Sequence, residues 1–158
     1  MFLLFCILKL DKYFENLDFS HFKNKLIFLD IDGTIVADSK FDVSADVLHK
    51  IKELDENNQV FLCTNSFHKD RAKNIANITK LKFIDCHHKK PSKKILNYIP
   101  KELLNLGKVV IGDKFLTEGL FAIRIKGEFL KVKRKVNKDV FYIKIINFID
   151  DLVIKFLL

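Results

Sequence analysis

Short apolar runs alternate along this chain with segments in which apolar residues recur at helical spacing. The runs predict strands at 26–31, 60–64, 82–85, 109–111 and 129–133. The first run is apolar on both faces, as in a parallel sheet covered by helices. Between the strands, apolar residues spaced by three and four predict helices near 44–57, 68–79, 95–99 and 116–124, with a short turn of helix after Pro100. This alternation predicts a doubly wound α/β fold.

We expect one domain over residues 1–158, because no linker rich in Gly, Pro or Ser divides the chain. It comprises an amino-terminal arm (1–24), a catalytic core (25–125), and a basic segment with an apolar carboxyl-terminal helix (126–158). The predicted architecture is a three-layer α/β/α sandwich with a mostly parallel, Rossmann-like sheet of five strands. The intervals 32–64 and 64–90 are too short to hold a further domain that would cap the sheet, so the carboxyl edge of the sheet should be open.

Both ends of the chain are apolar. Residues 1–8 are too few to span a bilayer, and they are compatible with a strand, a packed arm or a weak membrane-surface contact. Residues 139–158 predict a helix whose polar residues form one narrow stripe, at Lys144, Asn147, Asp151 and Lys155. That helix is too polar to be transmembrane. It should either pack against the domain or a second subunit, or lie in a membrane interface.

The net charge of +8 is concentrated, and residues 126–138 hold six basic residues against Glu128 alone. Such a surface attracts phosphoesters, nucleic acid or acidic lipid, although solvated loops that keep a protein in solution have the same composition. The three cysteines are odd in number and have no CxxC spacing, which indicates reduced thiols in a cytoplasmic location.

Candidate chemistry begins with Asp30 and Asp32, which end the first predicted strand and are followed at once by Gly33. Open α/β sheets bind ligands at the carboxyl ends of their strands, although an Asp-x-Asp-Gly sequence at that position can also be a simple turn. Further polar residues follow the later strands: Thr64 and Asn65, Lys90, Asp113, and then Glu118. Carboxylates, a hydroxyl, an amide and a lysine in one crevice would suit phosphoryl transfer through a carboxylate.

These residues resemble the four motifs of phosphatases of the haloacid dehalogenase (HAD) superfamily, class IIIA. Asp30-Ile31-Asp32-Gly33-Thr34 resembles the first motif, Thr64-Asn65 the second, Lys90-Pro91 the third, and the segment 112–118 the fourth, in matching order over about residues 25–125. Within the superfamily the chain is most similar to the YqeG-type phosphatidylglycerophosphate phosphatases. It departs from the usual pattern in having Glu118 in place of Asp in the fourth motif and Thr64 in place of Ser in the second.

The resemblance assigns roles that elementary chemistry supports. Asp30, ionised at neutral pH, would attack phosphorus and form an aspartyl-phosphate, and Asp32 would act as general acid and then general base. Lys90 would neutralise phosphoryl oxygens, and Thr64 and the Asn65 backbone would bind them through hydrogen bonds. Mg²⁺ would be held by oxygen ligands. The candidate ligands are Asp30, Asp32 through its carbonyl, Asp113 and Glu118.

The expected function is therefore a magnesium-dependent phosphomonoesterase, a hydrolase of phospholipid metabolism that converts phosphatidylglycerophosphate to phosphatidylglycerol with peripheral contact to a membrane. Two alternatives stay open. The first is a capless phosphatase for a soluble sugar phosphate or a nucleic-acid end, which a homo-oligomer could help to enclose. The second is a non-catalytic basic binding module, for which charge is the sole argument, because the chain has neither a base-stacking motif nor a helix-turn-helix pattern.

Overall fold

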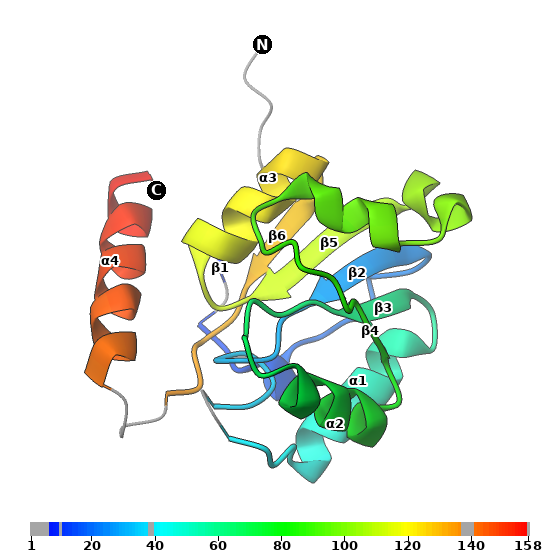
Figure 1. Cartoon of the computed structure of the whole chain (residues 1–158), viewed down its shortest axis with the longest axis horizontal. Coiled ribbons are helices and arrows are strands. Elements are labelled where there is room, and N and C mark those ends of the chain that lie inside the picture. Colours follow the sequence, from blue (N-terminus) through cyan, green and yellow to red (C-terminus); the bar gives the residue numbers. More distant parts are fainter. Residues whose placement is uncertain (1–6, 10, 38–39, 137–140, 158) are drawn as a thin grey trace.

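The computed structural model describes residues 7–9, 11–37, 40–136 and 141–157, and its centre is a parallel sheet (Figure 1). The strand order is β1-β6-β5-β2-β3-β4, and every pairing is parallel. The strands are β1 Ile7–Lys9, β2 Lys25–Leu29, β3 Gln59–Leu62, β4 Lys82–Phe83, β5 Gly107–Gly112 and β6 Glu128–Lys131. The prediction of a parallel α/β sheet is confirmed. The expected number of five strands is wrong for the described residues, because β1 in the amino-terminal arm adds a sixth strand beside β6.

The central strand β2 is buried on both faces, as its composition predicts. Leu29 is in register with Leu62 of β3 and with Ile111 of β5. Ile27 and Leu29 belong to one hydrophobic cluster, whereas Leu26 and Phe28 belong to a second. Alternate side chains of a strand point to opposite faces, so the two clusters lie on the two sides of the sheet.

The helices divide between these clusters. α1 (Ala45–Asp55) and α2 (Lys69–Thr79) contribute to the cluster of Ile27. α3 (Leu120–Ile125) and the 3₁₀ helices η2 (Lys93–Tyr98) and η3 (Lys101–Asn105) contribute to the cluster of Phe28. Figure 1 shows α1 and α2 on the opposite side of the sheet from α3. Elements therefore cover both faces of β2.

Three details differ from the predicted helices. The segment near 95–99 is a 3₁₀ helix, and the helix expected at 116–124 begins as a π-helical turn, η4 (Phe115–Gly119), before α3. A further 3₁₀ turn, η1 (Phe14–Asn16), lies in the amino-terminal arm. Other local signals operate as expected: the Ser44 hydroxyl caps α1 by accepting from the amide of Val47, and Pro100 separates η2 from η3.

The carboxyl-terminal helix α4 (Phe141–Leu157) lies at the edge of the domain (Figure 1). Ile154 joins the cluster of Phe28, but the other buried side chains include Asn147 and Asp150. The exposed side chains include four large apolar ones at helical spacing, Ile145, Phe148, Ile149 and Leu152. Of the alternatives for this helix, packing of its apolar side on the domain does not hold for these four residues, because Asp150 makes the polar contacts described below. Packing on a second subunit and contact with a membrane interface stay predictions. Among the described residues, none of the helices is both long and apolar enough to span a bilayer.

The connections at the carboxyl edge of the sheet are short. From β2 to β3 the described residues form a loop and α1, and from β3 to β4 they form a loop and α2. Neither connection holds a further domain within the described residues. In the described residues, the connections that follow β2 and β3 therefore place only a loop and one helix after the strand ends that carry Asp30 and Thr64.

Candidate active site

The loop after β2 brings the first motif against the fourth. Gly33 has φ 78°, a left-handed conformation that favours glycine, and its amide donates to the carbonyl of Val36 at 2.8 Å. A Cβ atom at Gly33 would lie 2.6 Å from Oδ2 of Asp113. The chain thus requires glycine here both for its backbone turn and for the close approach of Asp113.

Lys90 lies between two buried carboxylates. Its ammonium Nζ is 2.5 Å from Oδ1 of Asp30 and 2.6 Å from Oε1 of Glu118. The Asn65 amide group fixes this lysine, because its Nδ2 donates to the Lys90 carbonyl at 2.8 Å and its Oδ1 accepts from the Lys90 amide at 2.7 Å. The sequence predicted that the Asn65 backbone binds the substrate, which stays a prediction, and the Asn65 side chain has the further role of positioning Lys90.

Glu118 is engaged at both oxygens. Its Oε1 faces Lys90, and its Oε2 accepts from the Thr117 hydroxyl at 2.5 Å and from the Lys114 amide at 3.3 Å. These contacts make Glu118 a partner of Lys90 in this structure, a role that differs from the predicted metal ligand. The contacts also explain a glutamate at this position, since it reaches Lys90 while Gly112 leaves room: a Cβ at Gly112 would lie 2.3 Å from Cγ of Glu118.

Asp32 has a different cation. Its Oδ1 is 2.8 Å from NH1 of Arg71, which stands in the first turn of α2. The Thr64 hydroxyl lies 3.5 Å from Oδ2 of Asp32 and accepts from the Ser66 amide at 3.1 Å. Sequence reasoning missed Arg71. The available signal was its place next to Ala72 and four residues before Ile75, on the apolar side of a helix that follows β3.

Asp113 is fully buried, and its cation comes from the basic segment after β6. Nε of Arg134 is 2.6 Å from Oδ2 of Asp113, and NH2 of Arg134 is 3.3 Å from the Asp113 carbonyl oxygen. Lys131 also donates to that carbonyl oxygen, and Lys114 lies 3.3 Å from Oδ2. Neither Arg134 nor Lys131 was predicted to belong to the site.

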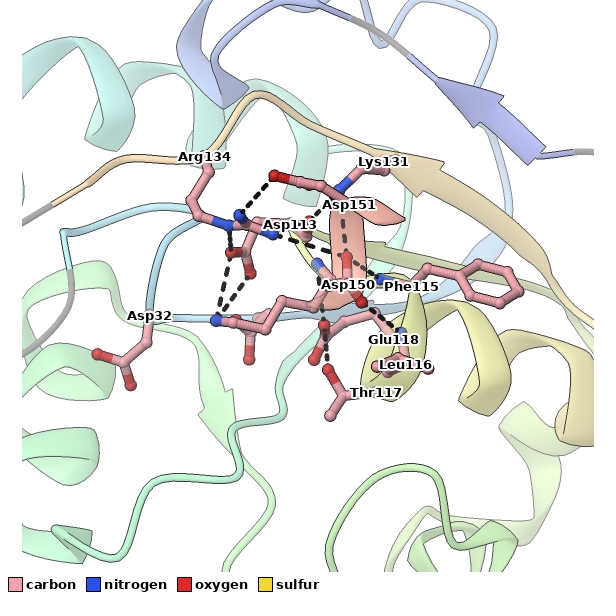
Figure 2. A network of polar contacts seen from close by, with 12 residues as sticks. Asp32, Asp113, Phe115, Leu116, Thr117, Glu118, Lys131, Arg134, Asp150 and Asp151 are labelled. Carbon is pink, nitrogen blue, oxygen red and sulfur yellow. Dashed lines mark hydrogen bonds and ion pairs between the residues drawn. The ribbon is translucent and has the colours of Figure 1, made fainter. Parts of the chain in front are cut away.

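Asp150 of α4 ties this cluster to the carboxyl-terminal helix. It accepts from the amides of Phe115 and Leu116 at 3.0 and 2.7 Å, and it lies 3.6 Å from Arg134 and 3.7 Å from Lys131. Figure 2 shows these groups converging at the start of η4. A buried carboxylate is stabilised only when it is paired and hydrogen-bonded, and these contacts explain why this polar face of α4 is turned inward.

Burial changes the acidity of the cluster. It raises the pKa of Asp30 to about 8, with Lys90 acting in the opposite sense, and it also raises the pKa of Asp113. For Glu118, burial acts to raise the pKa, but the Lys90 ammonium outweighs it and the pKa is lowered. For Lys90, burial acts to lower the pKa, but Asp30 and Glu118 outweigh it and the pKa is raised. The lysine therefore stays charged and faces two buried carboxyl groups. The expectation that Asp30 is ionised at neutral pH differs from this site without metal, where a pKa of about 8 favours the protonated form.

The residues suit magnesium by their chemistry. Carboxylates of Asp30 and Asp113 and the carbonyl of Asp32 are hard oxygen donors, and burial raises the pKa of both carboxyl groups, so a bound cation would favour their charged forms. Lys90 contacts one oxygen of Asp30, and Arg134 contacts one oxygen of Asp113. Within the described ranges, no group of three or more His, Cys, Asp or Glu side chains is already arranged to hold a metal ion.

The structure thus brings the predicted residues together in linked pairs. Lys90 joins Asp30 to Glu118, Thr64 lies beside Asp32, and the Gly33 turn packs on Asp113. No family model, curated protein or solved structure matches this chain. What the site does is therefore argued from its own geometry.

Proposed function

We propose that the protein is a magnesium-dependent phosphomonoesterase with a HAD-like three-layer fold that works through an aspartyl-phosphate. The observation that carries the proposal is the buried Asp30–Lys90–Glu118 cluster, with Asp32 two residues from Asp30 and Asp113 at the end of the neighbouring strand. Four motifs in the order of the HAD phosphatases supply these residues. A turn or a solvated surface would not require buried charges at all of these positions.

In the proposed reaction, the Asp30 carboxylate attacks phosphorus while the bond from phosphorus to the leaving oxygen breaks. The electron pair of that bond stays with the leaving oxygen, which takes a proton from Asp32. Asp32 then removes a proton from water, whose oxygen bonds to phosphorus while the bond from phosphorus to the Asp30 oxygen breaks. The electron pair of that bond returns to Asp30, inorganic phosphate leaves, and Asp32 is protonated again. Lys90 stabilises the charge on the phosphoryl oxygens, and Thr64 donates a hydrogen bond to one of them.

Magnesium would be held by the carboxylates of Asp30 and Asp113 and by the Asp32 carbonyl, and it would neutralise charge on the phosphoryl group. The chain's own task is to present these oxygens from neighbouring strands. Lys90 holds the Asp30 carboxylate and Arg134 holds the Asp113 carboxylate, so each has a defined orientation before a ligand arrives.

For the substrate we propose phosphatidylglycerophosphate, met by a cytoplasmic protein at a membrane surface. Short connections over the strand ends would leave room for a phosphate carried on a large molecule, and the exposed apolar row of α4 suits a lipid interface. The basic segment lends less support than its composition suggests, since Lys131, Arg134 and Lys135 form ion pairs with Asp150, Asp113 and Glu15. A soluble phosphoester is the alternative.

The test is turnover of an aryl phosphate with and without Mg²⁺. We expect activity that is abolished by a chelator and by Asp30→Asn, and that is retained by Asp46→Asn, a matched loss of charge on the exposed first turn of α1. A panel of phosphatidylglycerophosphate in detergent micelles and soluble phosphoesters then separates the two substrates. Absence of turnover in the folded wild type would leave the non-catalytic binding module as the better account.

A further inference from the structure

A cavity of about 600 Å³ lies at the amino-terminal end of α2. Two aromatic rings, two basic side chains, a histidine and an aspartate line it: Phe41, Phe67, His68, Lys69, Asp70 and Arg71. Arg71 joins the cavity to the candidate active site, because its NH1 is 2.8 Å from Oδ1 of Asp32. None of the roles proposed above uses this cavity.

The guanidinium of Arg71 has an unmet hydrogen-bonding capacity. The residue is 6% exposed, its Nε donates to the Lys40 carbonyl at 2.7 Å, and its NH1 is paired with Asp32. Its NH2 nitrogen is buried and has no hydrogen-bond partner among the described residues. Buried guanidinium nitrogens are ordinarily satisfied, so this one indicates room for an acceptor that the described ranges 7–9, 11–37, 40–136 and 141–157 do not supply.

The rim of the cavity is apolar and cationic. Phe67 is 87% exposed and Phe41 is 54% exposed, although large aromatic side chains are ordinarily among the more buried in a fold. The Lys89 ammonium lies 2.9 Å from the centre of the Phe67 ring, and the Arg71 guanidinium lies 5.8 Å from that of Phe41. A ligand in the cavity would therefore meet positive charge in its interior and two ring faces at its mouth.

We propose that this cavity receives the alcohol part of the substrate and that Arg71 binds a second anionic group carried by that alcohol. The inference rests on the proposed function: Asp32 gives its proton to the leaving oxygen, so a cavity joined to Asp32 lies on the leaving-group side. While Asp32 holds that proton it is neutral, and Arg71 then needs another anion. The substrate class is a phosphomonoester whose alcohol also bears a carboxylate or a phosphodiester.

The test compares two soluble substrates that differ in one group. 3-Phosphoglycerate carries a carboxylate where glycerol 3-phosphate carries a hydroxymethyl group. We expect the wild type to prefer 3-phosphoglycerate in kcat/KM by about tenfold or more, the factor typical of one charge-assisted hydrogen bond. In Arg71→Gln the ratio should fall toward one, mainly through KM for 3-phosphoglycerate, and Arg71→Lys should restore part of it. Lys73→Gln, an exposed loss of charge on the same helix, should keep the wild-type ratio.

An aryl phosphate without a second anion provides the reference. If the wild type turns over the aryl phosphate but shows no preference between the two glycerol compounds, this inference is wrong and the proposed function stands. If Asp30-dependent turnover is absent altogether, the proposed function fails and takes the inference with it. An undiminished preference in Arg71→Gln would equally contradict the role of Arg71.

A measurement on the wild type covers the case in which Arg71→Gln does not fold. Glycerate should inhibit turnover of the aryl phosphate competitively and far better than glycerol, and equal inhibition by the two would contradict the proposal.

A comparison of two lipid substrates identifies the source of the anion. In vesicles, phosphatidylglycerophosphate carries a phosphodiester on its alcohol and phosphatidate does not. If the preference for phosphatidylglycerophosphate over phosphatidate exceeds the preference for 3-phosphoglycerate over glycerol 3-phosphate, the anion belongs to a lipid headgroup. If the preference for 3-phosphoglycerate is the larger, the anion belongs to a soluble substrate.

Discussion

Asp30 and Asp113 follow neighbouring parallel strands and are both buried, yet their charges are balanced by different parts of the chain. Lys90, the cation of Asp30, belongs to the core and is fixed by the Asn65 amide. Arg134, the cation of Asp113, follows the last strand and lies near Asp150 of α4. The surroundings of Asp30, the proposed nucleophile, therefore come from the α/β core, whereas those of Asp113, a proposed metal ligand, also depend on the carboxyl-terminal helix. The following predictions separate the two sides.

Lys90→Met should have the largest effect. It leaves Asp30 and Glu118 buried without their shared cation, which we expect to lower the free energy of unfolding by about 3–5 kcal/mol and to reduce kcat by at least ~1,000-fold. Chemical denaturation and aryl phosphate kinetics measure the two effects. Lys93→Met, an exposed lysine at the start of η2, is the control. Near-normal activity of Lys90→Met would remove the proposed core of the site.

Asp150→Asn should have an intermediate effect that is specific to the Asp113 side. The substitution weakens the contacts to two backbone amides and two cations, so we expect a loss of about 1–3 kcal/mol in stability and a higher Mg²⁺ concentration for half-maximal activity. Asp151→Asn is a close control, because Asp151 is 62% exposed and its ion pair with Arg134 is 3.5 Å long. Equal Mg²⁺ requirements in the two variants would show that α4 does not act on Asp113.

The acidity of Asp30 gives a smaller, pH-dependent effect. Its folded pKa of about 8 lies above its ordinary value of 3.8, so the folded state binds this proton more tightly than the unfolded state. The contribution of Asp30 to stability is full at low pH and is lost as pH rises between about 4 and 8. Without metal, the unfolding temperature should therefore fall less steeply over this window in Asp30→Asn than in the wild type. Asp113 retains a slope of the same sign in both proteins. Identical slopes would contradict the burial effect.

The outer face of α4 should show the smallest effect on the fold. Phe148 and Ile149 are exposed, so Phe148→Ser combined with Ile149→Ser should change stability by no more than about 0.5 kcal/mol. The same double variant should bind vesicles of anionic lipid less than the wild type in co-sedimentation. Unchanged sedimentation would show that this row does not meet the lipid, and a large loss of stability would show that it packs on protein.

Features of this molecule that depend on local sequence could be predicted, whereas contacts between residues far apart in the sequence could not. The strand ends at Asp30, Thr64 and Asp113 could be predicted because apolar runs and polar ends are local features, and the topology of a parallel sheet brings them to one edge. Arg134 could not be predicted, since a basic residue in a basic segment has the same local sequence whether it is solvated or buried in an ion pair. For Arg71 the helical spacing to Ile75 indicates burial, but it does not indicate Asp32 as the partner. The orientation of α4 was not predicted for the same reason. Its amphipathic pattern indicates an apolar side that includes Phe148, but it does not indicate that Asp150 accepts from two backbone amides and lies near two cations. The third helix expected near 95–99 was placed correctly, yet its 3₁₀ geometry carries no clear sequence signal.

The central claim is that Asp30 carries the phosphoryl group during turnover, and trapping that group tests it most directly. The protein would be mixed with a ³²P-labelled phosphomonoester and Mg²⁺, quenched in acid and digested, with Asp32→Asn included because it should slow hydrolysis of the intermediate. We predict a hydroxylamine-labile label on the peptide that contains Asp30, at a higher level in Asp32→Asn than in the wild type and absent in Asp30→Asn. Turnover by the wild type with no label on that peptide in either protein, or label that persists in Asp30→Asn, would contradict the account.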